Sequence, residues 1–268
     1  MFSHTFFGID FIKSSYEDCL REIQIRLVEG QKTLIVTPNP EMLYAASQDA
    51  ELQKILESSD MALPDGVGIF VGYQIRASRL PKWMKYMMLP YWCLRAIMQT
   101  EKFRKYYGER ITGSKITPDI LSYAAQNSIG ISIIDPPVTG NSPGDTLKKE
   151  SQKTMKDILQ KKYPGLMCDI ILADSGGKGD YWPIVLTTHG NGTQEKIVTQ
   201  ILAENSEVLL GIGVGSSIDL LTGFRIPAPI FFRRFGGEWL YRLYKNPRKH
   251  IKRIGNVWQF LKICLGEN

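Results

Sequence analysis

Two stretches decide the fold of this chain: Thr37-Pro-Asn-Pro-Glu41 and Leu63-Pro-Asp65-Gly66-Val-Gly68. Each one follows a short apolar run, which is typical of a buried strand that ends in a polar loop before a helix. Asn39 predicts a helix N-cap, with Pro40 at the first helical position. Because open α/β sheets bind ligands beyond the carboxyl ends of their strands, we expect Thr37, Asn39 and Asp65 to line one crevice. The alternative is that Asn39 and Asp65 serve only as helix caps.

Strand and helix patterns alternate along the rest of the chain. The first strand is predicted at Phe6–Phe11, and a helix follows over Tyr16–Val28. This rhythm predicts an α/β fold with a Rossmann-like, mostly parallel sheet and helices on both faces. Residues 1–223 are expected to form this catalytic domain. Further strands are predicted at Thr33–Val36, Ile129–Ile134, Gly165–Leu172, Ile184–Leu186 and Val208–Ile212, and a helix is predicted from Thr117 onward.

The composition is that of a globular protein with a normal core. The chain has 268 residues, of which 43% are hydrophobic and 22% are charged. Its four cysteines are scattered and form no Cys-x-x-Cys pair, so neither a zinc site nor a disulfide framework is indicated, and reduced thiols in the cytoplasm are expected. The first ten residues do not resemble a signal peptide, and no stretch approaches the roughly 20 apolar residues that span a bilayer.

Positive charge is concentrated in two segments. Nine Lys and Arg residues face two Glu residues between Arg76 and Arg110, and ten face one between Arg225 and Lys262. The net charge of the whole chain is only +6, so the remainder is acidic. No nucleic-acid-binding module is recognisable, which argues against nucleic acid as the partner. Two basic segments on an acidic body indicate a face that meets an anionic surface such as a membrane.

The motifs resemble those of a known family. Thr-x-Asn-Pro-Glu-Met-Leu over Thr37–Leu43, followed by a helix and Pro-Asp-Gly-x-Gly over Pro64–Gly68, is similar to the signature of the WecG/TagA/CpsF bacterial glycosyltransferases. Arg110-Ile-Thr-Gly113, Gln194-Glu195 and the segment Phe235–Arg248 also match the family's pattern. The resemblance spans almost the whole chain. It departs at Lys115, where the family commonly has an acidic residue, and before Gln194, where the family has Pro-Lys.

This resemblance implies an inverting, metal-independent transferase that needs no cofactor. It implies that a sugar moves from a UDP-sugar to a polyprenol-diphosphate-linked sugar at the cytoplasmic face of the membrane, during synthesis of a cell-surface polysaccharide such as teichoic acid or capsule. N-acetylmannosamine, its uronic acid and glucose remain alternatives for the sugar. Inversion requires one general base, and Asp65, on a glycine-flanked turn at a strand end, is our candidate.

Several further residues are candidates for binding substrate. No Asp-x-Asp pair and no His or Cys cluster is present to hold a metal ion, so the charge of a leaving UDP must be met by arginines and backbone amides. Asp219 would accept a sugar hydroxyl or cap a helix. The full set of candidates is Thr37, Asn39, Arg110, Gly190 in the loop before a helix, Gln194, Asp219, and the three appendage arginines Arg233, Arg242 and Arg248.

Two segments are expected to lie outside the sheet. Residues 78–107 look like an insertion relative to the family and are apolar with basic flanks. This segment fits a helical hairpin packed on the core, an interfacial segment in lipid, or a contact with a second copy of the chain. Residues 224–268 resemble the family's C-terminal appendage and predict a basic amphipathic helix, which would associate with the membrane or present a solvated face.

Two other functions compete with the transferase. The run Gly211-x-Gly213-x-Gly215 is similar to a dinucleotide-binding fingerprint, which would suit a nucleotide-dependent oxidoreductase, but its third glycine comes one residue early. The second alternative is a degenerate, non-catalytic membrane-associated relative. UDP should stabilise a transferase and NAD an oxidoreductase, whereas Asp65→Asn should leave a non-catalytic module unchanged.

Overall fold

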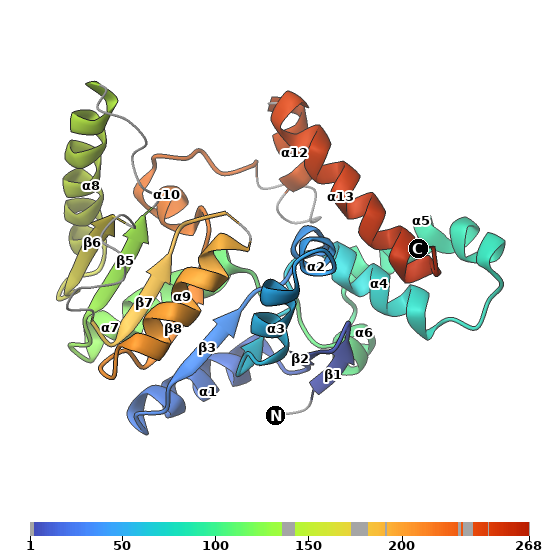
Figure 1. Cartoon of the computed structure of the whole chain (residues 1–268), viewed down its shortest axis with the longest axis horizontal. Coiled ribbons are helices and arrows are strands. Elements are labelled where there is room, and N and C mark those ends of the chain that lie inside the picture. The colour runs from blue at the N-terminus through green and yellow to red at the C-terminus, as the bar shows by residue number, and fades with distance from the viewer. Residues whose placement is uncertain are drawn as a thin grey trace. The chain divides into compact units, whose positions relative to one another are not determined.

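The computed structural model describes residues 3–135, 143–172, 182–190, 192–229, 232, 238–245 and 247–267. The chain forms two compact units that alternate along the sequence. Unit 1 comprises Met1–Cys19, Thr37–Thr112 and Pro227–Asn268, and unit 2 comprises Leu20–Val36 and Gly113–Ile226. Figure 1 labels the helices and strands of both units.

Unit 1 begins with a β-hairpin. Strands β1 (Ser3–Phe6) and β2 (Ile9–Ile12) are antiparallel, with Phe6 opposite Ile9. The turn residues Phe7 and Gly8 have φ values of 55° and 76°. The prediction of one strand over Phe6–Phe11 is therefore wrong. A two-residue hairpin turn with both φ values positive usually carries Asn-Gly or Asp-Gly, and Phe-Gly gives a much weaker signal.

The remainder of unit 1 is mainly helical. Strand β4 pairs parallel to β2, with Phe11 opposite Ala62. Asn39 caps α2 and Pro40 is its first residue, as predicted. The elements are α2 (Pro40–Ala46), α3 (Ala50–Glu57), β4 (Met61–Ala62), α4 (Val67–Ala77), α5 (Lys82–Met98), α6 (Glu101–Tyr107), α12 (Glu238–Lys245) and α13 (Pro247–Leu265).

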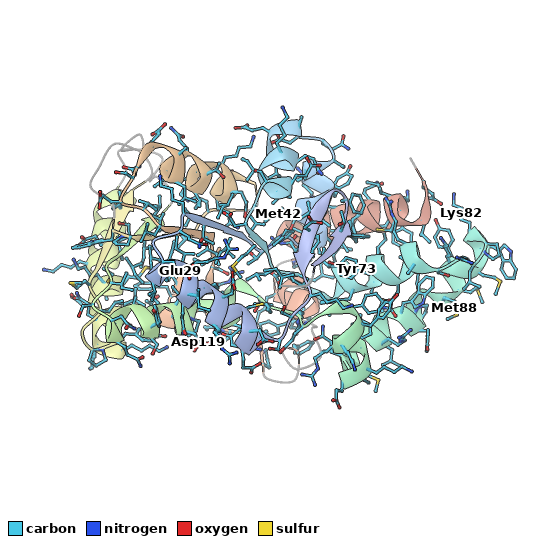
Figure 2. The ribbon with its side chains drawn as sticks, turned by 90° about the horizontal axis from the view of Figure 1, so that it is seen from below. Glu29, Met42, Tyr73, Lys82, Met88 and Asp119 are labelled. Carbon is cyan, nitrogen blue, oxygen red and sulfur yellow. The ribbon has the colours of Figure 1, made fainter. Side chains whose placement is uncertain are left out.

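An aromatic cluster forms the core of unit 1. Tyr73 of α4 lies at its centre, 4.7 Å from Phe6 of β1 and 5.9 Å from Tyr107 of α6, measured between ring centroids. Burial raises the pKa of the Tyr73 hydroxyl well above its ordinary value. Figure 2 shows Tyr73 on α4 and Met42 on α2, and both side chains are almost fully buried. The cluster joins segments that are distant in sequence, so its members stabilise the unit as a whole.

Helix α13 contributes directly to this core. Phe260 has no exposed surface, and its ring lies 6.2 Å from that of Phe6. The close approach of α13 to α4 depends on Gly72, because a Cβ atom at this position would lie 2.8 Å from Phe260 Cζ and 3.2 Å from Cys264 Sγ. Burial raises the pKa of the Cys264 thiol to about 12. The apolar face of α13 therefore packs in its C-terminal half against protein.

Unit 2 is an α/β layer structure. Its strands lie in the order β3-β8-β7-β5-β6, and every neighbouring pair is parallel. Helix α9 packs on β7, β8 and β3, and α8 packs on β6. The prediction of an α/β fold with a mostly parallel sheet is confirmed. Helix α1 (Tyr16–Val28) begins in the first segment of unit 1 and continues into unit 2 from Leu20. The other elements of unit 2 are β3 (Thr33–Val36), α7 (Gly113–Gln126), β5 (Ile131–Asp135), α8 (Pro143–Lys162), β6 (Cys168–Leu172), β7 (Ile184–Thr187), α9 (Thr193–Glu204), β8 (Leu210–Gly213) and α10 (Ser217–Thr222).

Two helices continue through a proline, contrary to expectation. Helix α7 begins at Gly113 and contains Pro118, so the predicted start at Thr117 is wrong. Packing explains the difference, because Gly113 is buried against Val214 and a Cβ at Gly113 would lie 3.5 Å from Val214 Cα. Helix α5 likewise continues through Pro90. Tertiary contacts have overridden a local helix-breaking signal in α7.

Candidate active site

Three loops of unit 1 meet at Asp65. The backbone N–H of Asp65 donates to the carbonyl oxygen of Pro38, with an N···O distance of 3.0 Å. The N–H of Ile111 donates to the carbonyl oxygen of Pro64 at 3.1 Å. These two bonds join the loop after β3, the loop after β4 and the segment that carries Arg110. The backbone of Asp65 therefore lies beside Pro38, between Thr37 and Asn39 in sequence, and the segment of Arg110 lies beside Pro64.

Asn39 fixes the first of these loops. Its side-chain oxygen accepts a hydrogen bond from the Met42 N–H at 3.0 Å, and its carbonyl oxygen accepts one from Leu43 at 3.0 Å. Thr37, directly after β3, is 6% exposed. The capping role that the sequence predicted for Asn39 is thus confirmed. The cap makes α2 begin directly after Asn39, close to Thr37.

Asp65 does not occupy the N-cap position of α4. The N-cap of α4 is Gly66, which has a φ of 89° and forms no side-chain capping bond. Asp65 therefore precedes the cap, with its side chain partly exposed. The capping role left open by the sequence for Asp65 is therefore not realised at the N-cap position itself.

The starts of α2 and α4 interlock. A Cβ atom built on Gly68 would lie 2.5 Å from Cγ of Pro40, so no larger residue fits between the two loops. The proline ring is rigid and cannot move aside as a long side chain would. An anion near Asp65 would lie at the N-terminus of α4, where backbone N–H groups favour negative charge.

Arg110 is held by the end of the 78–107 segment. Its backbone N–H donates to Oε1 of Gln99 at 3.4 Å. Gln99 ends α5 in the left-handed conformation, with a φ of 41°. The guanidinium group of Arg110 is thus carried by a chain segment that is bonded both to the Asp65 loop and to the α5–α6 connection.

The candidates in unit 2 surround the start of α9. Gln194 is 3% exposed, and its Oε1 accepts from the Gly215 N–H at 3.2 Å while its Nε2 donates to Glu195 Oε1 at 2.7 Å. Glu195 Oε2 accepts from the Gly192 N–H at 2.7 Å. Burial raises the pKa of Glu195. The Gln194-Glu195 pair that matched the family thus connects α9 to the loop after β8.

The remaining candidates of unit 2 are less constrained. A Cβ at Gly190 would have open space around it, and the Gly190 carbonyl oxygen accepts from the Gln194 N–H at 3.3 Å. Asp219 is in the first turn of α10, whose N-cap is Ser216, and its carbonyl oxygen accepts from the Arg225 N–H at 3.0 Å. The predicted capping role for Asp219 is therefore not realised at the N-cap position.

The three predicted appendage arginines are only partly placed. Arg233 lies outside the described residues, and Arg242 and Arg248 lie in α12 and α13 with side chains outside the described part. Sequence reasoning missed Arg253 of α13, whose Nε donates to Glu41 Oε2 at 2.7 Å. Glu41 is two residues after Asn39. No local signal connects residues 212 positions apart, so this contact could not have been predicted.

Comparison with known proteins identifies the family. The model of the glycosyl transferase WecG/TagA/CpsF family matches residues 4–96 and 182–268. The chain belongs to the WecG/TagA/CpsF family. As such it is a glycosyltransferase, and the suspected resemblance is confirmed. The first matched range contains Thr37, Asn39 and Asp65, and the second contains Gly190, Gln194, Asp219 and the appendage.

Two curated relatives of this family carry the same name, N-acetylglucosaminyldiphosphoundecaprenol N-acetyl-beta-D-mannosaminyltransferase. One, from Bacillus spizizenii (strain ATCC 23059 / NRRL B-14472 / W23), is 25% identical over 242 residues, which covers 90% of this chain and 82% of the relative. The other, from Bacillus subtilis (strain 168), is 23% identical over 250 residues, which covers 92% of this chain and 85% of the relative.

Family membership removes the oxidoreductase alternative, and the structure explains the glycine run that suggested it. A Cβ at Gly211 would collide with Val198 and Leu202 of α9. A Cβ at Gly213 would lie 2.5 Å from Cδ of Gln194. These two glycines are therefore required for the packing of α9 on β8, which is a structural use that needs no dinucleotide.

Proposed function

We propose that this glycosyltransferase moves an N-acetylmannosamine-type sugar from a UDP-sugar to a polyprenol-diphosphate-linked sugar during synthesis of a bacterial cell-surface polysaccharide. Support comes from the two Bacillus relatives, whose names specify an N-acetyl-mannosaminyl group and an N-acetylglucosaminyl-diphosphoundecaprenol acceptor. The two relatives are only 23–25% identical to this chain, so the transferred sugar need not be the one in their names. The alternatives are the uronic acid of N-acetylmannosamine and glucose.

Asp65 acts as the general base in this proposal. The observation that supports this assignment is the bond between the Asp65 N–H and the Pro38 carbonyl oxygen, which holds the backbone of residue 65 next to the Thr37–Asn39 loop. Inversion requires a base that removes the proton of the acceptor hydroxyl as the hydroxyl attacks the anomeric carbon. Thr37 and Asn39 position the sugar or the acceptor beside that carboxylate.

Charge on the leaving UDP is balanced without a metal ion in this proposal. Arg110 supplies a guanidinium that binds diphosphate oxygens in bidentate fashion. The N-terminus of α4 supplies backbone N–H groups next to Asp65. The appendage arginines Arg233, Arg242 and Arg248, together with Gly190, Gln194 and Asp219, remain predicted substrate-binding residues.

The reaction takes place at a membrane surface in this proposal, because the acceptor is anchored by a polyprenol chain. Among the described residues, no helix is long and apolar enough to cross a bilayer. We therefore infer peripheral association with the inner face of the cell membrane, driven by the basic segments of the chain.

Asp65→Asn tests the proposal directly. This substitution keeps the size of the side chain and removes the base, so we expect kcat for transfer to a sugar-diphosphate-lipid analogue to fall about 100-fold or more, with a small change in the KM for the UDP-sugar. Asp60→Asn, at an exposed aspartate before β4, is the matched control and should retain activity. Unchanged turnover by Asp65→Asn would refute the assignment of Asp65.

The donor is identified in a separate experiment. A thermal-shift screen of UDP-sugars should single out one or two that raise the melting temperature, since a ligand at 100 times its Kd stabilises the native state by about 2.7 kcal/mol. NAD serves as the negative control. A melting temperature that responds to NAD and to no UDP-sugar would contradict the proposed donor class.

A further inference from the structure

One face of helix α5 is apolar and exposed. Its side chains follow one another at spacings of four, four, three and four residues, which places them on a single stripe along the helix. Their exposed fractions range from 50% to 75%, whereas Trp92 and Ala96 on the opposite face are buried. The stripe consists of Trp83, Met87, Tyr91, Leu94 and Met98.

The buried face of α5 explains why the helix is rigidly held. It packs on α4, and Gln74 of α4 donates from Nε2 to the Trp92 carbonyl oxygen at 3.1 Å. The far end of α13 also holds α5, because Glu267 accepts from the Tyr86 hydroxyl and lies 3.0 Å from Lys82 Nζ. The 78–107 segment is thus a hairpin that packs on α4 through one side and leaves apolar side chains exposed on the other.

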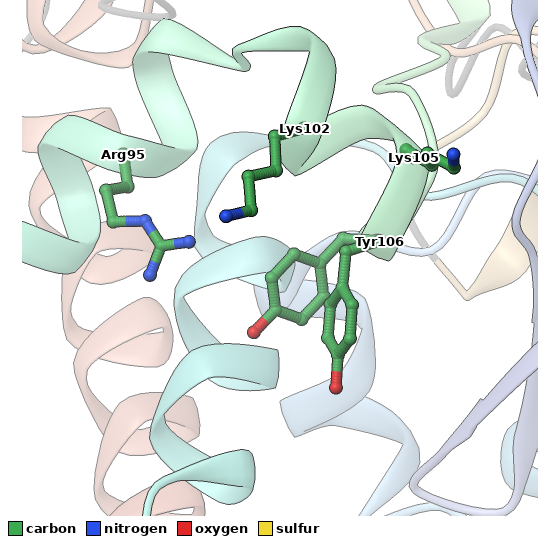
Figure 3. A pocket seen from close by; sticks show the side chains of 5 residues that line it. Arg95, Lys102, Lys105 and Tyr106 are labelled. Carbon is green, nitrogen blue, oxygen red and sulfur yellow. The ribbon is translucent and has the colours of Figure 1, made fainter.

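A basic cavity adjoins this stripe. Its volume is about 520 Å³, and it is lined by Arg95, Lys102, Lys105, Tyr106 and Tyr107. In Figure 3 the Arg95 guanidinium and the Lys102 ammonium point toward the same space beside the tyrosine rings, while Lys105 lies at the other side of the opening. Among the residues that the structure describes, no carboxylate lines the cavity.

Arg95 connects the cavity to the stripe. Its guanidinium carbon lies 5.7 Å from the centroid of the Tyr91 ring on the stripe and 5.8 Å from that of Phe103, a buried residue of α6. This arrangement places a fixed positive charge directly beside exposed apolar side chains. An anion bound in the cavity would therefore lie next to the apolar material that covers the stripe.

We propose that the α5–α6 hairpin is a lipid-docking surface, in which the stripe enters the acyl region of an anionic bilayer and the basic cavity receives the phosphate of a lipid headgroup. Charge complementarity favours this occupant over a second copy of the chain. A twofold dimer through this face would bring two basic cavities into one interface, and none of their described lining residues carries a carboxylate that could pair with the partner's cations. Trp and Tyr on the stripe suit the depth of the headgroups.

This inference rests on the proposed function, because a polyprenol-linked acceptor requires the active site to reach a bilayer. It adds a named contact surface. Arg110, in the candidate active site, is bonded to Gln99 at the end of α5, so the docked hairpin and the Asp65 loop are joined through a few residues of backbone. Docking through α5 would therefore set the position of that loop relative to the lipid surface.

Vesicle flotation tests the stripe. The protein is mixed with vesicles of phosphatidylglycerol and phosphatidylcholine in equal parts, and the wild type should float with them. Met87→Glu/Leu94→Glu should reduce the bound fraction about tenfold or more, because two apolar side chains lose burial and two charges are added. Ile25→Glu/Val28→Glu on α1, also exposed apolar positions, is the matched control and should float as the wild type does.

The cavity has its own pair of variants. Lys102→Gln/Lys105→Gln should weaken binding to the phosphatidylglycerol vesicles several-fold, whereas Lys153→Gln/Lys161→Gln on α8 removes the same charge and should have a much smaller effect. Equal losses in the two variants would show a general charge effect and would refute the headgroup site. Competition by inorganic phosphate at a concentration that leaves the ionic strength unchanged would identify a site for free phosphate and would also overturn it.

Two further outcomes separate this proposal from its alternatives. If the stripe is an interface between copies, sedimentation will show a wild-type dimer that Met87→Glu/Leu94→Glu converts to a monomer with unchanged flotation, and the docking proposal fails. Transfer to a short-chain, water-soluble acceptor should be preserved in that variant. If the wild type does not transfer sugar to this acceptor, the result counts against the proposed function. The flotation assay tests lipid docking independently of that result.

Discussion

At the scale of single residues, the candidate site depends on a glycine as much as on its carboxylate. Gly68 lies in the first turn of α4, where alanine would normally favour the helix by about 1 kcal/mol. A Cβ there meets the Pro40 ring at 2.5 Å, and overpacking of this kind costs about 1–3 kcal/mol. The steric cost exceeds the gain in propensity, so we expect Gly68→Ala to lower both stability and transfer rate.

Gly255→Ala supplies the comparison for this prediction. Gly255 lies within α13, and a Cβ there would contact nothing within 4 Å. The same substitution at this position should therefore stabilise the protein by about 0.5–1 kcal/mol. Chemical denaturation of both variants measures the two changes, and equal effects on the free energy of unfolding would show that the Pro40–Gly68 contact is not limiting.

Prediction of single residues from the sequence succeeded in the two loops that follow short buried strands. Asn39 and Asp65 follow short buried strands, and both the capping bond and the proximity of the two loops are observed. Gln194 shows the limit of this reasoning. Its motif match predicts a substrate contact, which stays a prediction, and the structure adds bonds of its amide to Glu195 and Gly215 at the buried start of α9. A motif match singles out a position in the sequence, and the structure shows which contacts the side chain at that position makes.

At the scale of elements, the packing of α13 on α2 and α4 was not predictable from the sequence. The sequence indicates an amphipathic α13, but periodicity alone does not say whether protein or lipid covers the apolar face. The structure shows that Phe260 and Cys264 are buried against Gly72 of α4. The start of α7 was predicted wrongly for a similar reason, since a helix was expected from Thr117, whereas Gly113 is buried and α7 begins there.

The Glu41–Arg253 ion pair provides a prediction at this scale. The pair joins the first turn of α2 to α13, and its side chains are 22% and 41% exposed. Because of that exposure, a double-mutant cycle with Glu41→Gln and Arg253→Gln should give a coupling energy of only about 0.5–1 kcal/mol. Arg253→Gln should also lower transfer, since α2 starts at the candidate site. Lys252→Gln, at an exposed neighbour, is the control.

A cycle with no coupling would contradict this view of α13. It would mean that the ion pair is solvated and that apolar packing alone holds α13 on α2 and α4. The effect on transfer discriminates further, because a loss of stability without any change in turnover would leave Arg253 as a residue of the fold only. Salt should weaken the coupling, as expected for a partly exposed pair.

At the scale of the whole molecule, the C-terminal segment and the start of the chain belong to one compact unit. Pro227–Asn268 groups with Met1–Cys19 and Thr37–Thr112, although the sequence separates it as an appendage after residue 223. Phe6, Tyr73 and Phe260 lie in one aromatic cluster. The sequence alone could not reveal this grouping, because apolar residues at both ends of a chain carry no information about whether they meet.

Truncation after Gly223 is the corresponding experiment. The shortened chain would lose Phe260 and leave the aromatic side chains around Gly72 exposed, so we expect a lower melting temperature and stronger binding of a hydrophobic dye. A chain that ends at Leu265 is the control, because it keeps Phe260 and loses the contacts of Glu267 with Lys82 and Tyr86 and the backbone bonds of residues 266 and 267 to the last turn of α13. In the full-length protein, the raised pKa and burial of Cys264 should also keep this thiol resistant to alkylation near neutral pH, as mass spectrometry can measure. If the Gly223 truncation melts at the wild-type temperature, or if Cys264 reacts as fast as an exposed thiol, α13 is an attached helix and the core of unit 1 is complete without it.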